Sequence, residues 1–288
     1  MSSTPISPQT DLTALAAAEE ADRARRFGGV ARLYGAPALA AFERAHVAVI
    51  GIGGVGSWVA EALARSAIGT LTLIDLDNVA ESNTNRQIHA LDGNYGKPKV
   101  EAMAERIRLI DPACDVRLVE DFVEPSNFDA LLGGGFDYVI DAIDSVRTKT
   151  ALIAWCVEHR QPLVTVGGAG GQLDPTSIRI DDLAQTIQDP LLSKVRGQLR
   201  KHYGFPRGPK AKFKVSAVYS DEPLIYPEVA VCDVDPEAEH LATSPGHHAP
   251  VGLNCAGFGS SVCVTASFGF AAAAYVLRGI AQTQRQAG

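Results

Sequence analysis

The sequence lacks closely spaced cysteine pairs and Cys/His clusters, although it contains five cysteines. Zinc knuckles and disulfide frameworks need such groupings, so neither is indicated. The first 25 residues include an alanine-rich run interrupted by Glu19, Glu20 and Asp22, and they lack the apolar core of a secretory signal. These absences favour a cytoplasmic protein whose tail, residues 1–25, is partly disordered and partly helical, with the helix ending near Arg26.

An overall excess of positive charge is also missing. The 288 residues carry a formal net charge of −7, and 46% of them are hydrophobic. This composition indicates a globular protein with a sizeable core and argues against a surface that is basic throughout. Residues 191–215 depart from it, because they contain eight cations and no acid: Lys194, Arg196, Arg200, Lys201, Arg207, Lys210, Lys212 and Lys214.

Charge is absent altogether from residues 251–277, a run long enough to span a bilayer. Asn254, Ser260, Thr265 and several glycines dilute the run, which favours a buried helix. We therefore expect a C-terminal helix over residues 261–288 that packs on the sheet or on a dimer mate, with loose membrane association as the alternative.

Short apolar stretches alternate with segments of helical periodicity between residues 46 and 166. Strands are expected at 46–50, 71–76, 116–119, 138–143 and 163–166, and helices at 57–66, 97–110, 126–132 and 147–159. Such alternation is typical of a mostly parallel sheet covered on both faces. We predict a Rossmann-like α/β domain over residues 26–180, followed by a basic insertion and an exposed loop over residues 181–260.

A glycine-rich turn, GIGGVG, follows the first expected strand. Such a turn lets backbone N–H groups at a helix N-terminus contact phosphate oxygens. Asp75 lies nineteen residues after Gly56, where dinucleotide-binding enzymes place an acid that holds a ribose hydroxyl. These two features alone leave an NAD-binding oxidoreductase open.

The motifs that follow favour a nucleoside triphosphate. SNTNRQ concentrates side-chain donors around Arg86, and GKPK opens a helix with two cations, so Arg86 and Lys99 can join the backbone amides around phosphates. Asp141 and Asp144 lie at the end of another expected strand. A carboxylate at such a position can hold Mg²⁺ against phosphates.

The order GIGGVG, DLDNV, SNTNRQ, GKPK and DAID resembles the E1-like adenylating superfamily, which includes the ThiF and MoeB activators of sulfur-carrier proteins. The stretches RFGGVARLYG, GGAGGQLDP, TIQDP and CAGFG are similar to those of the bacterial tRNA threonylcarbamoyladenosine dehydratases, the TcdA or CsdL family. The resemblance covers the chain from Arg26 to about Ile280.

This resemblance implies an enzyme that uses ATP to adenylate the carboxylate of N6-threonylcarbamoyladenosine in tRNA. The carbamoyl nitrogen then closes a ring and expels AMP. A carboxylate is a poor electrophile, and an acyl-adenylate supplies the leaving group for this intramolecular attack. The first rival hypothesis is adenylation of the C-terminus of a ubiquitin-like sulfur carrier, and the second is an NAD-binding oxidoreductase.

The resemblance also implies the site residues. Gly53, Gly54 and Gly56 would face the phosphates, and Asp144 would bind Mg²⁺. Arg86, Lys99 and Asp144 would act mainly by positioning and charge stabilisation. The full set implied for the nucleotide is Gly51, Gly53, Gly54, Gly56, Asp75, Asp77, Asn83, Arg86, Gln87, Lys99 and Asp144.

Two further candidates are an N-terminal arginine, where the sequence departs from the family pattern, and a C-terminal cysteine. Many relatives begin with RYxRQ, whose second arginine reaches the nucleotide of the partner subunit, and here Arg32 or Arg26 is the candidate for that role. Cys255 matches the family's C-terminal cysteine and can carry a transient adduct, with Cys232 a weaker candidate, although cyclisation itself needs no thiol. The other cysteines are expected in the core: Cys114, Cys156 and Cys263.

The basic segment at residues 191–215 suits a tRNA substrate, because lysine and arginine contacts to phosphates supply affinity without reading sequence. A basic linker is the alternative. The resemblance further implies a homodimer and, in some relatives, a cysteine desulfurase and its sulfur acceptor as partners.

Overall fold

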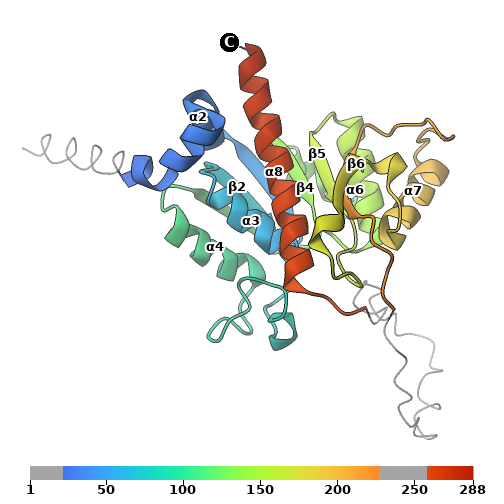
Figure 1. Cartoon of the computed structure of the whole chain (residues 1–288), viewed down its shortest axis with the longest axis horizontal. Coiled ribbons are helices and arrows are strands. Elements are labelled where there is room, and N and C mark those ends of the chain that lie inside the picture. Colours follow the sequence, from blue (N-terminus) through green and yellow to red (C-terminus); the bar gives the residue numbers. More distant parts are fainter. Residues whose placement is uncertain (1–21, 227–257, 288) are drawn as a thin grey trace, which may run out of the picture.

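The computed structural model describes residues 22–226 and 258–287, and it contains one seven-stranded sheet in the order β3-β2-β1-β4-β5-β7-β6 (Figure 1). Strands β1 to β5 and β7 are parallel, and β6 is antiparallel to β7. The predicted mostly parallel, Rossmann-like fold is confirmed. The strands are β1 His46–Ile50, β2 Thr70–Ile74, β3 Asp115–Val119, β4 Tyr138–Asp141, β5 Leu163–Val166, β6 Ile178–Asp182 and β7 Ser216–Ser220.

Helices cover both faces of this sheet because its strands send alternate apolar side chains to opposite sides. In β1, Val47 and Val49 join one buried cluster, whereas Ala48 and Ile50 join the other. The first cluster contains side chains of α2 Ala36–Arg44, α3 Gly56–Ala64, α4 Lys99–Ile110 and α8 Val262–Ala287. The second contains those of α5 Phe128–Leu132 and α6 Val146–Glu158, and α7 Pro190–His202 packs on α6. Short 3-10 turns lie at Glu81–Asn83, Pro175–Ser177 and Leu183–Gln185.

The part of the chain after residue 171 contributes more regular structure than the sequence indicated. Strand β7 pairs with β5, so the sheet continues past the expected domain boundary at residue 180, which falls inside β6. The basic segment begins within α7, whose Leu192, Val195 and Leu199 are buried in a cluster shared with α6. Residues 190–202 therefore form a packed helix and not a linker.

Helix α8 crosses one face of the sheet and packs on α2 and α3 (Figure 1). Gly269 is required at this contact, because a Cβ atom there would lie 2.8 Å from both Trp58 Cβ and Val55 O. By length and composition Val262–Thr283 could cross a membrane, but 56% of its most apolar window is buried inside the protein. Packing on α2 and α3 therefore buries much of the apolar surface of this helix.

The N-terminal helix is longer than predicted. Residues 22–34 are helical, so the helix continues to Tyr34 and does not end near Arg26. Phe27 is 3% exposed, and Val30 and Tyr34 pack against the main core cluster. The extra turns persist because they bury apolar side chains.

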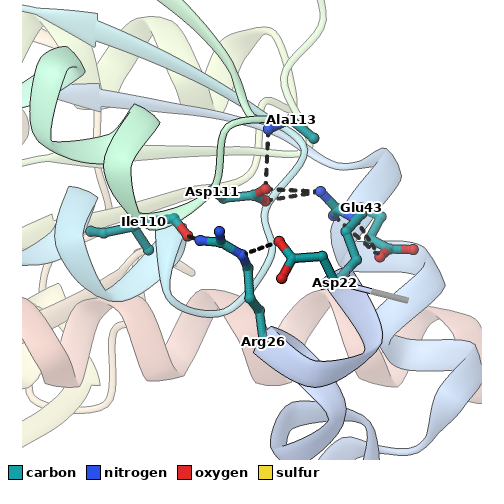
Figure 2. Close-up of polar contacts among 7 residues, drawn as sticks. Asp22, Arg26, Glu43, Ile110, Asp111 and Ala113 are labelled. Carbon is teal, nitrogen blue, oxygen red and sulfur yellow. Dashed lines mark hydrogen bonds and ion pairs between the residues drawn. The ribbon is translucent and has the colours of Figure 1, made fainter. Parts of the chain in front are cut away.

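Charged contacts attach this helix to the body of the domain. Figure 2 shows the Arg26 guanidinium between the Asp22 carboxylate and the carbonyl of Ile110, at 2.6 and 2.9 Å. Arg23 donates to Asp111, the residue after α4, at 2.9 Å and to Glu43 of α2 at 3.2 Å. The first helix thus ties α2 to the end of α4.

Candidate active site

A cavity of about 410 Å³ opens at the carboxyl ends of the strands, above β1 and its neighbours β2 and β4. The strand order reverses here, and α/β proteins bind ligands at such switch points. The volume lies in the range of small-molecule sites. Its walls come from the glycine turn, the SNTNRQ and DAID motifs, the start of α4 and α8, and the stretch at 167–170.

The glycines of the first turn serve different purposes. Gly51 has φ +87°, and a Cβ atom there would lie 2.9 Å from the carbonyl oxygen of Ala142. Gly53 and Gly54 line the cavity, where the backbone is open to a ligand. Gly56 does not line it: a Cβ atom would be 1.7 Å from the carbonyl oxygen of Gly51. Gly56 lies where helix α3 packs on the turn, and its expected contact with phosphates stays a prediction.

Asp75 lies at the end of β2 and lines the cavity. Its carboxylate accepts hydrogen bonds from the backbone N–H groups of Ile52 at 2.6 Å and Asp77 at 2.8 Å. Burial raises the pKa of Asp75, and the Lys99 ammonium and these two N–H groups act in the opposite direction. The carboxylate is thereby fixed beside the glycine turn, as a ribose-binding acid requires.

Lys99 is the first residue of α4, and it is 6% exposed although it is a lysine. Its ammonium lies 2.7 Å from Asp77 Oδ2, and both residues line the cavity. The Asp77 side chain is 66% exposed, so water can solvate its carboxylate when the Lys99 ammonium is withdrawn from it. The ammonium can therefore exchange a carboxylate for a phosphate without leaving its place.

Arg86 lies across Gly54, with its Cγ and Cδ atoms 3.2 Å from the position of an added Cβ. The guanidinium donates to the Ser82 carbonyl at 2.8 Å and to Asn85 Oδ1 at 2.9 Å. The backbone carbonyl of Arg86 accepts a hydrogen bond from Trp58 Nε1 at 2.9 Å. These contacts hold the second cation over the glycine turn.

Two of the three side-chain amides of SNTNRQ, Asn83 and Gln87, differ in their hydrogen bonding. Asn83 Oδ1 accepts from the Ala80 N–H at 3.0 Å and closes the 3-10 turn. Gln87 lines the cavity, is 6% exposed, and its Oε1 has no hydrogen-bond partner among the described residues. A buried oxygen without a partner is costly, so this amide fits a bound polar ligand.

Two acids lie at the end of β4: Asp141 has structural partners, whereas Asp144 is open to a ligand. Asp141 is fully buried and accepts from Lys149 Nζ at 2.7 Å and Thr165 Oγ1 at 2.6 Å, so it is not free for a metal. Asp144 is exposed and lines the cavity. Within residues 22–226 and 258–287 no group of three acids, histidines or cysteines could hold a metal. Mg²⁺ bound with phosphates needs only one or two carboxylates, so Asp144 alone could supply the protein ligand.

Arg32 and the three cysteines that the structure describes do not line this cavity. Arg32 is exposed on the N-terminal helix, and Cys255 lies outside the described residues. Cys114 and Cys156 are buried as predicted, and burial raises the pKa of each thiol to about 12. Cys263 was expected in the core but is exposed, because it falls on the outer face of the first turn of α8.

The basic segment starts at the cavity, where Leu191 of α7 forms part of the wall. Arg196 donates to Thr186 Oγ1, and the guanidinium of Arg200 lies 5.2 Å from the centre of the Phe213 ring. Both are half-buried and already have structural contacts. The other six cations are exposed: Lys194, Lys201, Arg207, Lys210, Lys212 and Lys214.

Comparison with known proteins assigns a family to this arrangement. The ThiF family model matches residues 28–285. The chain belongs to the ThiF family. This membership confirms the resemblance drawn from the motif order, whereas the oxidoreductase hypothesis rested on the glycine turn and Asp75 alone.

One curated relative and two solved structures are particularly similar to the chain. The tRNA threonylcarbamoyladenosine dehydratase of Escherichia coli strain K12 is 53% identical over 257 residues, 88% of this chain and 92% of that protein. The crystal structure of E. coli TcdA in complex with ATP has a TM-score of 0.80 at 49% identity, over 92% of this chain and 97% of that one. The corresponding AMP complex has a TM-score of 0.79 at 50% identity, over 90% and 96%.

Several lining residues of this ThiF-family site carried no assigned role in the sequence. They come from the chain after β3, the glycine stretch after β5, and the start of α8: Phe122, Val123, Gly167, Gly168, Ala169, Gly170, Phe258, Ser260 and Thr265. The GGAGG motif contributed to the family resemblance, but only the sheet order shows that it borders the nucleotide motifs.

Proposed function

We propose that the chain is an ATP-dependent tRNA threonylcarbamoyladenosine dehydratase. It would adenylate the carboxylate of N6-threonylcarbamoyladenosine and close the ring to the cyclic form. The supporting observation is one cavity in which Arg86, Lys99 and Asp144 surround an open glycine turn. The similarity to E. coli TcdA, crystallised with ATP and with AMP, supports the same reaction.

The reaction has two balanced steps. The substrate carboxylate attacks the α-phosphorus of ATP, a carboxyl oxygen–phosphorus bond forms, and pyrophosphate leaves. The carbamoyl nitrogen then attacks the activated carbonyl, loses its proton, and AMP departs with the former carboxylate oxygen. Backbone N–H groups at Gly53 and Gly54 and the two cations would stabilise the phosphate charge that develops, which is positioning and electrostatic catalysis.

Asp144 is the residue that would hold Mg²⁺, which supplies neutralising charge to the phosphates. Its exposure and its place at the end of β4 leave room for water and phosphate oxygens to complete the coordination. Asp141 cannot share this task because Lys149 and Thr165 occupy its carboxylate.

We further propose a homodimer in which Arg32 acts on the nucleotide of the partner subunit. Arg32 is exposed and lies away from the cavity of its own chain, so its action requires a second copy. A cysteine desulfurase and its sulfur acceptor are proposed as further partners from the family resemblance alone.

The function is tested by incubating the protein with ATP, Mg²⁺ and tRNA that contains N6-threonylcarbamoyladenosine, followed by mass spectrometry of the tRNA nucleosides. The expected result is the cyclic nucleoside, with AMP and pyrophosphate, only when all components are present. Parallel reactions replace tRNA by a ubiquitin-like carrier protein. Pyrophosphate released with the carrier but not with tRNA would overturn the proposal.

Removing charge from the exposed basic segment should weaken tRNA binding. The variant Lys210→Gln/Lys212→Gln/Lys214→Gln loses three exposed cations, and Arg44→Gln/Arg108→Gln/Arg117→Gln is the matched control elsewhere on the surface. Each lost phosphate contact should reduce the slope of log affinity against log salt by about 0.7–0.9. Filter binding at several salt concentrations measures it, and equal slopes for the two variants would contradict a tRNA-binding role.

A further inference from the structure

The wall of the cavity beyond β5 is built on glycine backbone. Gly171 N–H donates to the Gly259 carbonyl at 2.8 Å, and the Gly171 carbonyl accepts from Ile225 N–H at 2.8 Å. Gly171 has φ +73°, and a Cβ atom there would lie 2.8 Å from Cδ1 of Phe258. The absence of a side chain at Gly171 therefore lets the Phe258 ring pack directly on the backbone.

Phe258 presents an aromatic surface to the cavity. Its ring lines the cavity and lies 5.2 Å from the ring of Tyr226, centre to centre. Tyr226 is 69% exposed, so the aromatic surface continues from the cavity wall to the outside of the protein. Exposed aromatic surface at a cavity mouth is a frequent site of ligand contact.

This aromatic wall adjoins the phosphate-binding residues. Asn85 donates from Nδ2 to the carbonyl and the hydroxyl of Ser260, at 3.0 and 3.2 Å. Asn85 immediately precedes Arg86, and its Oδ1 accepts from the Arg86 guanidinium. The wall is thus fixed to the residue that we place at the phosphates.

A buried hydroxyl lies in the same cavity. Thr265 of α8 lines it, is 3% exposed, and its Oγ1 has no hydrogen-bond partner within the described parts of the chain. A buried hydroxyl is costly unless it is bonded, so it fits a polar atom of a ligand. An aromatic ring and an unpartnered hydroxyl in one cavity match a ligand with a planar base and a polar substituent.

The cavity has two walls, one beside β1 and β2 and the other beyond β5, and each can be assigned to one of the two substrates, ATP and the acceptor. Asp75 and the glycine turn occupy the β1–β2 side, and they suit the ribose and phosphates of the nucleotide. An acceptor that attacks the α-phosphorus must approach from the side opposite the leaving pyrophosphate. The wall beyond β5 is the unassigned side.

On the basis of the proposed function, we propose that Phe258, with Tyr226 beyond it, stacks on the purine of the modified adenosine, and that the Thr265 hydroxyl binds its polar side chain. Proteins that bind unpaired RNA bases stack them on aromatic side chains in this way. These residues bind and orient the acceptor, and they take no part in bond formation or cleavage.

The test compares Phe258→Ala, Phe258→Leu and Phe258→Tyr in full-length protein of verified melting temperature. Loss of one base stack should raise KM for tRNA about 5- to 150-fold in the Ala and Leu variants. The Tyr variant keeps an aromatic ring and should stay close to the wild type. Thr265→Val, which keeps the shape and removes the hydroxyl, should also raise KM for tRNA. Affinity for ATP, measured by calorimetry without tRNA, should be unchanged in all four.

Each alternative has its own result. A Leu variant with wild-type KM would show that Phe258 only fills space, and a parallel loss of ATP affinity would place the ring at the nucleotide or in the fold. Either result overturns the stacking role. Failure of the proposed function is visible separately, because the wild-type protein would then bind ATP without converting the tRNA nucleoside.

Discussion

Arg86→Ala is expected to reduce tRNA-dependent pyrophosphate release by at least about 10²- to 10³-fold, the loss that follows removal of one preorganised donor to developing charge. The guanidinium lies over Gly54 at the cavity, and among the described residues its hydrogen bonds go only to the Ser82 carbonyl and Asn85 Oδ1. Ser82 and Asn85 are exposed, so loss of these two hydrogen bonds should leave the melting temperature nearly unchanged.

Arg147→Ala is the matched control for Arg86→Ala. Arg147 is exposed, three residues after Asp144, and it does not line the cavity. Its replacement should preserve both activity and stability. Pyrophosphate release and thermal unfolding are measured on all three proteins, and full activity of Arg86→Ala would refute the role assigned to the guanidinium.

Asp144→Ala should also reduce adenylation, but its effect should depend on the Mg²⁺ concentration. Loss of the carboxylate should abolish adenylation at ordinary Mg²⁺ concentrations and shift the Mg²⁺ dependence upward, because one ligand is removed. Titration of Mg²⁺ at fixed ATP measures this shift. An unchanged Mg²⁺ dependence would exclude metal binding by Asp144.

The sequence predicted those parts of the site that are local in the chain. A five-residue apolar strand followed by glycines specifies the turn at 51–56, and polar residues placed after strands lie at the same sheet edge in any parallel sheet. Asp75, Arg86 and Lys99 therefore line one cavity, as their motifs indicated. The strands up to β5 were likewise found from their apolar runs.

What escaped prediction depends on contacts between distant segments. β6 and β7 were not predicted, because they lie beyond the regular alternation of strands and helices and pair with each other across α7. Phe258 and Thr265 line the cavity because their segment contacts residues distant in the chain: Gly170 forms a bridge with Ser260, and Asn85 donates to Ser260. The contacts of Arg196 with Thr186 and of Arg200 with Phe213 likewise cannot be predicted from a sequence segment rich in cations.

Asp141 illustrates this limit, and it leads to the largest expected loss of stability. Its carboxylate and the Lys149 ammonium are 2.7 Å apart, both side chains are 0% exposed, and Thr165 completes the cluster. Lys149→Ala leaves a buried carboxylate without its counter-charge, which typically lowers the free energy of unfolding by about 3–5 kcal/mol. Urea unfolding at neutral pH measures this loss.

Lys97→Ala provides the comparison, because Lys97 also forms a 2.9 Å ion pair, with Glu105, but its side chain is 36% exposed. Exposed pairs contribute about 0–1 kcal/mol, so this variant should unfold nearly as the wild type does. The double variant Asp141→Asn/Lys149→Met should recover much of the stability, since it removes both charges and keeps an amide that can bond to Thr165. Equal losses in Lys149→Ala and Lys97→Ala would show that the buried pair is not what stabilises the end of β4.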